Sequence, residues 1–292
     1  MDVQCQDCGA LLHLAPNQRT TTCFYCRSPA IVSRPGDPRR PTPRFAVPFV
    51  LQPELAYARA RSWQNNLSWF RGPELRNAAI TGLQPIYAPC FLYSAIARSA
   101  YSVSIGENYT TGSGDNQRTH TEWRPLHGEH AAFVRDVVVS ASRGILNAEL
   151  ECIEPFDLRA LHRYTPALIS GWPAEEPSSE PQMVWAMARE EARQDIARRL
   201  HQFMPGDCYR GLKHQTELGS EALELVLMPL WVLPVRVAPN QPPVRLLVNG
   251  QTGKVYGPAR MAWGRVILLI ALVIGGFFLF SFLLFACVAV IA

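Results

Sequence analysis

The distribution of apolar and polar residues changes several times along the chain, and each change marks a different expected element. Residues 86–109 and 120–140 are rich in tyrosine, valine, phenylalanine, isoleucine and threonine, which favour half-buried β-strands. Between them, Gly112-Ser113-Gly114-Asp115-Asn116 is typical of a turn. We therefore expect the two stretches to pair as antiparallel strands.

Two other stretches repeat at the helical period. Residues 53–70 begin with Pro53, which suits a first helical turn, and their helical spacing involves Leu55, Ala56, Arg59, Ala60, Trp63 and Leu67. Residues 182–203 form the best helical pattern, ended by Pro205-Gly206. In this segment an apolar stripe and a charged face involve Met183, Ala186, Met187, Glu190, Ala197 and Leu200. We expect a helix that packs against the rest of its domain.

Strands are expected again over 223–237 and 244–256, the second stretch containing the hairpin signal Asn249-Gly250. Together these elements predict a central α+β domain with an antiparallel sheet over residues 48–258. Before it, residues 34–47 are rich in proline and arginine. Such a segment forms neither helix nor central strand, so it is expected to be a stiff linker.

The end of the sequence is apolar throughout. Residues 266–292 are 27 positions without a charge, or roughly 40 Å of helix at about 1.5 Å per residue, whereas a bilayer core needs about 20 residues. The pattern predicts a single transmembrane helix over 264–292. Lys254, Arg260 and Arg265 precede the apolar run and Trp263 stands at its threshold. By the positive-inside rule, residues 1–263 are expected on the cytoplasmic face of a bacterial inner membrane, held by the tail.

The amino-acid composition says little about which class of protein this is. The formal charge is +4 and the basic residues are almost all arginine, so the overall balance names no partner. Residues 1–44 hold six arginines against three aspartates, compatible with a nucleic acid, an acidic protein or anionic lipid. The first residues lack the basic and apolar regions of a secretory signal, and we expect none.

Four of the eight cysteines form two pairs, Cys5-x2-Cys8 and Cys23-x2-Cys26, with 14 residues between them. This spacing is typical of two knuckles that close a tetrahedral site of four thiolates. Zinc suits it, because thiolates are soft ligands and a unit as small as residues 1–33 needs a metal to fold. We predict a zinc ribbon over 1–33 with one structural zinc ion. A redox pair and an iron–sulfur site are the alternatives.

Three weaker patterns share some features with chemical sites. Gly250-Gln251-Thr252-Gly253-Lys254 has the wrong spacing for a phosphate-binding loop and is expected to be a hairpin turn. His127-Gly128-Glu129-His130 lacks the helical spacing of a zinc protease motif. The single cysteines have no recognisable activating neighbours, so we expect core cysteines at Cys90, Cys152 and Cys208.

The order and spacing of these features resemble a bacterial family of membrane-anchored zinc-ribbon proteins, labelled as having a TFIIB-type ribbon or as related to the primosomal helicase PriA. Besides the ribbon, the resemblance rests on Ile86-Tyr87-Ala88-Pro89, Glu122-Trp123, Val139-Ser140-Ala141-Ser142, Glu154-Pro155-Phe156-Asp157-Leu158, Leu168-Ile169-Ser170-Gly171-Trp172, Leu227-Met228-Pro229-Leu230-Trp231 and Val248-Asn249-Gly250-Gln251-Thr252-Gly253-Lys254. Helicase motifs are absent from the sequence. The resemblance implies association with PspA-like and flotillin-like (SPFH) proteins in envelope stress or membrane platforms.

These observations favour a non-enzymatic adaptor that binds partner proteins at the membrane. The linker would hold the ribbon clear of the central domain, leaving its side chains free to recruit the partner. The alternative is a membrane-tethered nucleic-acid binder, because residues 19–44 are rich in arginine and phosphate contacts depend on such residues. A hydrolase or transferase that uses the histidines is a third possibility.

Overall fold

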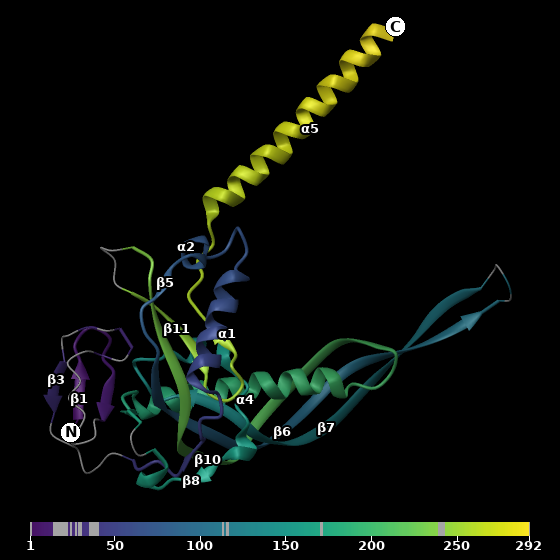
Figure 1. The fold of residues 1–292 in the computed structure, drawn as a ribbon. Coiled ribbons are helices and arrows are strands. Elements are labelled where there is room, and N and C mark those ends of the chain that lie inside the picture. The colour runs from purple at the N-terminus through teal and green to yellow at the C-terminus, as the bar shows by residue number, and fades with distance from the viewer. Residues whose placement is uncertain are drawn as a thin grey trace.

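The computed structural model describes residues 2–13, 23, 25, 26, 28, 31–34, 41–112, 114, 117–169, 172–238 and 243–291. Twelve strands in these residues form one sheet (Figure 1). Three belong to the N-terminal ribbon: β1 (Asp2–Cys5), β2 (Leu11–His13) and β3 (Ile31–Arg34). The others are β4 (Phe45–Ala46), β5 (Ala79–Ile80), β6 (Gln84–Thr111), β7 (Arg118–Ser140), β8 (His162–Arg163), β9 (Ala174–Glu176), β10 (Cys208–Arg236), β11 (Val244–Asn249) and β12 (Val255–Tyr256).

The helices lie against this sheet or lead away from it. They are α1 (Pro53–Asn65), α2 (Pro73–Arg76), α3 (Asn147–Ile153), α4 (Pro181–Phe203) and α5 (Trp263–Ile291), with short 3₁₀ turns η2 (Leu158–Ala160) and η3 (Pro166–Ile169). The predicted helix over 53–70 therefore forms but ends at Asn65, and the predicted helix over 182–203 is confirmed as α4.

The main path through the sheet runs β12-β11-β10-β6-β9-β2-β1-β3, while β7 pairs with β6 on the side away from β10, farther along the strand than β9. Most neighbours are antiparallel, but β4 with β10 and β6 with β9 are parallel. The predicted fold class is corrected here, because the sheet is mixed and the ribbon strands continue it. Backbone pairing of β2 with β9, for example Leu12 with Glu175, makes that continuation.

The ribbon is consequently not held clear of the domain that follows, and that expectation is wrong. One hydrophobic cluster contains ribbon residues Val3, Ala10 and Tyr25 together with Ile145 and Leu150 of the central domain. Burying such apolar surface is the main source of stability in a fold. The proline-rich segment therefore connects two parts that share a core.

The strands β6, β7 and β10 extend far beyond the rest of the sheet (Figure 1). We call residues 94–111, 118–134 and 208–222 the arm. The predicted pairing of 86–109 with 120–140 is confirmed by the regular register of β6 and β7, which continues to Thr111 opposite Arg118. Because β10 begins at Cys208 opposite Gly106, the last part of the arm has only two strands.

Helix α4 covers one face of the arm root. The side chains that make this contact are spaced four residues apart and are fully buried: Val184, Ala188, Ala192, Ile196 and Leu200. The predicted packing role is confirmed, and of the predicted stripe Leu200 is buried and Met187 packs, partly buried, against the same cluster, whereas other members are exposed. Met183, for example, is 59% exposed. Small alanines at the true interface allow the helix to lie close to the sheet.

The final helix, α5, leads away from the body (Figure 1). Its side chains are described from Trp263 to Phe278, a length of roughly 24 Å at about 1.5 Å per residue. The remaining positions of the predicted 264–292 span lie outside the residues whose side chains are described. Within the described part of the chain, no helix combines the length and apolar character required to cross a membrane.

The predicted transmembrane helix is therefore wrong by this criterion, since a span requires about 20 apolar residues. The predicted tail anchor, the cytoplasmic-face orientation, the inner-membrane location and the membrane as a partner all depended on that span. The same finding on the described helices therefore overturns these four expectations.

Candidate metal centre

The four paired cysteines lie together at the ribbon end of the sheet. Cys5 ends β1, and the backbone then turns back: the amide of Gly9 donates to the Cys5 carbonyl at 3.0 Å, and the amide of Cys5 donates to the Ala10 carbonyl at 3.0 Å. Gly9 has a φ of +73°, which favours glycine at this turn. On the second knuckle, the Cys23 amide donates to the Ser28 carbonyl at 2.8 Å.

The sulfur atoms are close enough to share one ion. All four Sγ atoms lie within 4.8 Å of one another, with Cys5 to Cys26 at 3.4 Å and Cys8 to Cys23 at 3.5 Å. A tetrahedral ion with bonds of about 2.3 Å to sulfur needs sulfur atoms about 3.8 Å apart. Because the observed set matches this size, the four predicted ligands form a cluster that could hold a metal ion.

Placing four thiols together changes their proton affinities. A hydrogen bond from Cys23 is the largest influence on Cys8 and lowers the pKa of its thiol to about 5. The same hydrogen bond raises the pKa of Cys23, and burial raises the pKa of Cys26 to about 12. A bound cation favours the deprotonated form of every thiol that it binds.

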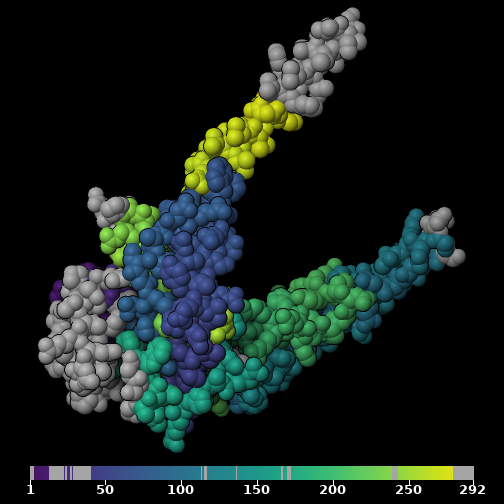
Figure 2. Space-filling view, in the orientation of Figure 1, coloured from purple at the N-terminus to yellow at the C-terminus, as the bar shows by residue number. Residues whose placement is uncertain are grey.

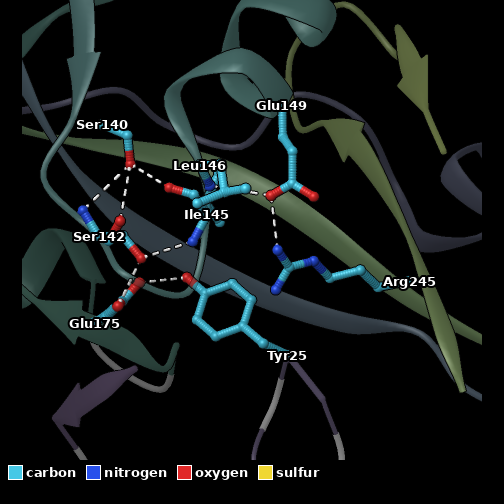
Figure 3. A network of polar contacts seen from close by, with 8 residues as sticks. All are labelled: Tyr25, Ser140, Ser142, Ile145, Leu146, Glu149, Glu175 and Arg245. Carbon is cyan, nitrogen blue, oxygen red and sulfur yellow. Dashed lines mark hydrogen bonds and ion pairs between the residues drawn. The ribbon is translucent and has the colours of Figure 1, made fainter. Parts of the chain in front are cut away.

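A buried polar network joins the second knuckle to the central sheet (Figure 3). Tyr25, which stands between Cys23 and Cys26 in the sequence, donates a hydrogen bond from its hydroxyl to Glu175 Oε2 at 2.6 Å. Ser142 donates to the other carboxylate oxygen at 2.7 Å. Burial raises the pKa of Glu175 to about 7, while these two hydrogen bonds act in the opposite direction.

Sequence patterns did not identify Tyr25 or Glu175 as site residues. The two are 150 positions apart, and neither belongs to a motif with chemical meaning on its own. The acidic pair Glu175-Glu176 does not reveal that Glu175 is buried, and only burial creates its need for hydrogen-bond donors. Only the fold shows which donors they are.

The other sequence patterns do not converge. His127 and His130 lie opposite Ser102 and Ser99 on β6 and, being three positions apart, point to opposite faces of the sheet. The ring of His130 packs 4.9 Å from that of Phe203. Residues 250–254 form the predicted hairpin between β11 and β12. The histidine pair therefore offers no common metal site.

Three of the four single cysteines have described side chains, and these differ in exposure. Cys90 is buried as predicted, whereas Cys152 is exposed and Cys208 is half-buried. The prediction of a core cysteine is thus wrong at Cys152, because that residue faces outward from the short helix α3.

A second group of acidic side chains lies between α3 and α4. Glu154 Oε1 and Glu191 Oε2 are buried and, among the described residues, have no hydrogen-bond partner. Burial, followed by repulsion from Glu191 and Glu151, raises the pKa of Glu154 to about 8. Burial and the charge of Glu151 raise the pKa of Glu191 to about 7. Folding therefore favours the protonated forms of these two groups.

Comparison with known proteins gives little further information. No family model and no solved structure matches the chain. The chain is similar to uncharacterized protein YdjG of Bacillus subtilis (strain 168), with 24% identity over 244 residues that cover 81% of this chain and 69% of that protein. The resemblance to membrane-anchored zinc-ribbon proteins, and the association with PspA-like and SPFH proteins that it implies, stays a prediction.

Proposed function

We propose that this chain is a non-enzymatic adaptor in which one structural zinc ion holds the ribbon together and the arm binds a partner protein. Zinc is the ion best suited to four thiolates. It is borderline-soft and has no redox chemistry, and its filled d shell imposes no geometry of its own, so four ligands can surround it tetrahedrally. Bound there, it would cross-link Cys5, Cys8, Cys23 and Cys26 and contribute to folding, with no coordination position left for a substrate.

The observation that carries the adaptor proposal is the face of the arm that α4 does not cover. Val134 points to α4 and is buried, so the adjacent Phe133 points to the opposite face, where it is 60% exposed. Trp123 is ten residues earlier on β7 and, by the two-residue period of a strand, lies on the same face. It is 36% exposed. At about 3.3 Å per residue the two side chains lie roughly 33 Å apart along β7, so the exposed face of the arm offers two separate apolar contact points to a partner.

Each of these aromatic rings also has an arginine against it. The guanidinium of Arg210 lies 4.0 Å from the ring centre of Trp123, and that of Arg135 lies 5.2 Å from the ring centre of Phe133. Tryptophan and arginine are enriched among the residues that contribute most to protein–protein affinity. The arm also projects well beyond α4 (Figure 1), and its end stands clear of the body in the space-filling view (Figure 2).

The charge of the arm favours a protein partner over a nucleic acid. It carries five basic residues, Arg98, Arg118, Arg124, Arg210 and Lys213, and five acidic residues, Glu107, Glu122, Glu129, Glu217 and Glu221. Nucleic-acid binding surfaces instead concentrate positive charge, because most of their affinity comes from neutralising phosphates. Mixed charge of both signs is compatible with the rim of a protein interface.

The proposal can be tested by photo-crosslinking in cells. A photoreactive amino acid is placed at Ala131, which is exposed on the same face as Phe133. A control carries it at Arg193, which is exposed on α4. An adaptor gives a discrete protein adduct from position 131 and none of the same mass from position 193. The adduct is expected to disappear when Trp123→Ala and Phe133→Ala are added.

Two results would contradict the proposal. Adducts of equal pattern from both positions would mean that the arm has no specific partner. Nucleic acid crosslinked at position 131, in amounts that fall steeply with salt, would favour the alternative of a nucleic-acid binder. The same experiment in a Cys23→Ser, Cys26→Ser variant tests the expectation that the ribbon also contributes to recruitment.

A further inference from the structure

The second knuckle contacts the central domain through a side chain that lies between two metal ligands in the sequence. Tyr25 is 1% exposed and Glu175 is 2% exposed, so their 2.6 Å hydrogen bond is shielded from water (Figure 3). Glu175 belongs to β9, whose backbone also pairs with β2 of the ribbon. The knuckle therefore makes its contact at the strand that joins the ribbon to the rest of the sheet.

The hydrogen bonds continue from Glu175 into the loop that connects β7 with α3. Ser142 Oγ donates to Glu175 Oε1 at 2.7 Å and accepts a hydrogen bond from the Ile145 amide at 3.0 Å. Ser140 Oγ donates to the Ile145 carbonyl at 2.6 Å. One continuous chain of buried hydrogen bonds thus runs from the knuckle to the end of β7, the strand that forms one edge of the arm.

The loop is shaped to receive the tyrosine ring. A Cβ atom at Gly144 would lie 2.8 Å from Tyr25 Cε2 and 3.0 Å from the Cβ of Ala10, so only glycine leaves room for the ring. On β11, Arg245 places its guanidinium 5.7 Å from the ring centre of Tyr25. Arg245 is itself fixed by an ion pair with Glu149 of α3 at 2.6 Å. The tyrosine is therefore held by groups from several separate elements.

We propose that Tyr25, Glu175 and Ser142 form a clasp that couples metal binding at the four cysteines to the order of the loop 141–146. The proposal rests on the zinc centre proposed above. A metal ion that joins Cys23 to Cys26 fixes the short knuckle between them and so places Tyr25 against Glu175. When the metal leaves, the knuckle loses its cross-link, and Glu175 and Ser142 lose the partner that completes their network.

Coupling of this kind is reciprocal. If metal binding favours the closed clasp, then the closed clasp must favour metal binding by the same factor. Removing either member of the Tyr25–Glu175 hydrogen bond is therefore expected to weaken zinc affinity, although neither residue can bind the ion. A loss of about tenfold is within the usual range for coupled sites. Because both substitutions remove one shared interaction, their effects are expected not to add.

The experiment is a zinc titration of the whole, metal-free chain against a competing chromogenic chelator under reducing conditions. Tyr25→Phe and Glu175→Leu, which leaves no acceptor for the tyrosine hydroxyl, are each expected to bind zinc about tenfold more weakly, and the double variant no more weakly than the weaker single one. Matched controls remove the same groups elsewhere: Tyr57→Phe on α1 and Glu129→Leu on the arm, both exposed. They are expected to bind zinc as the unchanged chain does.

If one of these variants shows no cooperative thermal unfolding even with saturating zinc, two other variants take its place. Gly144→Ala keeps every hydrogen-bonding group but crowds the tyrosine ring, and Ser142→Ala removes a hydroxyl from the network. The same loss of affinity is expected for each. Unchanged zinc affinity in the folded variants, or losses that multiply in the double variant, would overturn the clasp while leaving the zinc centre intact. An unchanged chain that binds no zinc would instead contradict the zinc centre itself.

Discussion

The ribbon end and the arm are both made of β-strands, yet they are held together in different ways. The arm is formed mainly by strands adjacent in sequence, and its β6–β7 register runs unbroken from Ala95 to Thr111. At the ribbon end, strands of three or four residues depend on contacts between distant positions, such as Tyr25 with Glu175. Long regular strands stabilise each other through backbone pairing, whereas short ones need a metal, a shared core and buried side-chain bonds.

The largest expected effect is the loss of zinc and of the fold at the ribbon end. Replacing Cys23 and Cys26 by serine is expected to lower bound zinc from about one ion per chain to none, since two of four ligands are lost. Structural zinc contributes an apparent free energy of about 10–16 kcal/mol in small zinc-finger peptides, so the ribbon should lose its fold. Elemental analysis and circular dichroism measure both effects. The matched variant Cys152→Ser, Cys208→Ser should retain its zinc, and equal loss in the two variants would contradict the assigned ligands.

The next effect is confined to the arm. Ile196 is fully buried between α4 and the sheet, and truncating it to alanine leaves a cavity, which costs about 2–5 kcal/mol of unfolding free energy. Chemical denaturation monitored by circular dichroism measures this loss, and zinc affinity should not change. Met183→Ala, on the exposed side of α4, is the control and should stay within about 0.5 kcal/mol. A matching loss of zinc affinity in Ile196→Ala would show that the two regions are not separate.

A smaller effect is the pH dependence of stability that Glu154 causes. The pKa of Glu154 is raised to about 8 in the folded chain from an ordinary value near 4.5. Across this interval the folded chain keeps a proton that the unfolded chain releases, so stability should fall as pH rises toward 8. Glu154→Gln removes this group's share of the dependence, leaving the shares of Glu191 and Glu175, and should raise the melting temperature above pH 8 relative to the unchanged chain. Glu129→Gln on the arm should leave the profile as it is, and a parallel profile for Glu154→Gln would contradict the assignment.

The smallest effect on stability is expected at the end of the arm. Tyr109 is 49% exposed and stacks on His120 with ring centres 5.6 Å apart. Exposed substitutions away from caps and cores change stability by about 0.5 kcal/mol or less, so Tyr109→Ala should melt and bind zinc as the unchanged chain does. Thermal denaturation checks this. A loss of several kcal/mol would mean that the arm end takes part in the fold's stability.

The same contrast explains what could be predicted from the sequence. The paired strands over 86–109 and 120–140 and the four clustered cysteines follow from local composition and spacing, and the structure bears them out. Residues 208–222 were not recognised as a strand, because this half of β10 is polar and interrupted by register shifts after Arg210 and Gly219. Sequence patterns report local preference, and such irregular strands are defined by their neighbours.

Features that join distant parts were missed for a related reason. The pairing of β2 with β9 and the burial of Glu175 bring together segments more than 150 residues apart, and no periodicity records such contacts. The apolar residues after Trp263 led to the opposite error. Their composition suggested a span, whereas no described helix meets the requirements for one. The stripe on α4 was partly misplaced, because the fully buried side chains of that helix are Val184, Ala188, Ala192, Ile196 and Leu200, whereas Met183 is exposed.

The most direct test of the account is hydrogen exchange of the intact chain, measured by mass spectrometry with zinc bound and after chelation. Exchange reports how often each segment opens. If the metal holds the ribbon and the clasp transmits its presence, amides in 2–13, 141–146 and 174–176 should lose protection after chelation, whereas the arm amides over 98–106 should exchange as before. Unchanged protection at 141–146 and 174–176, or equal loss along the arm, would contradict the account.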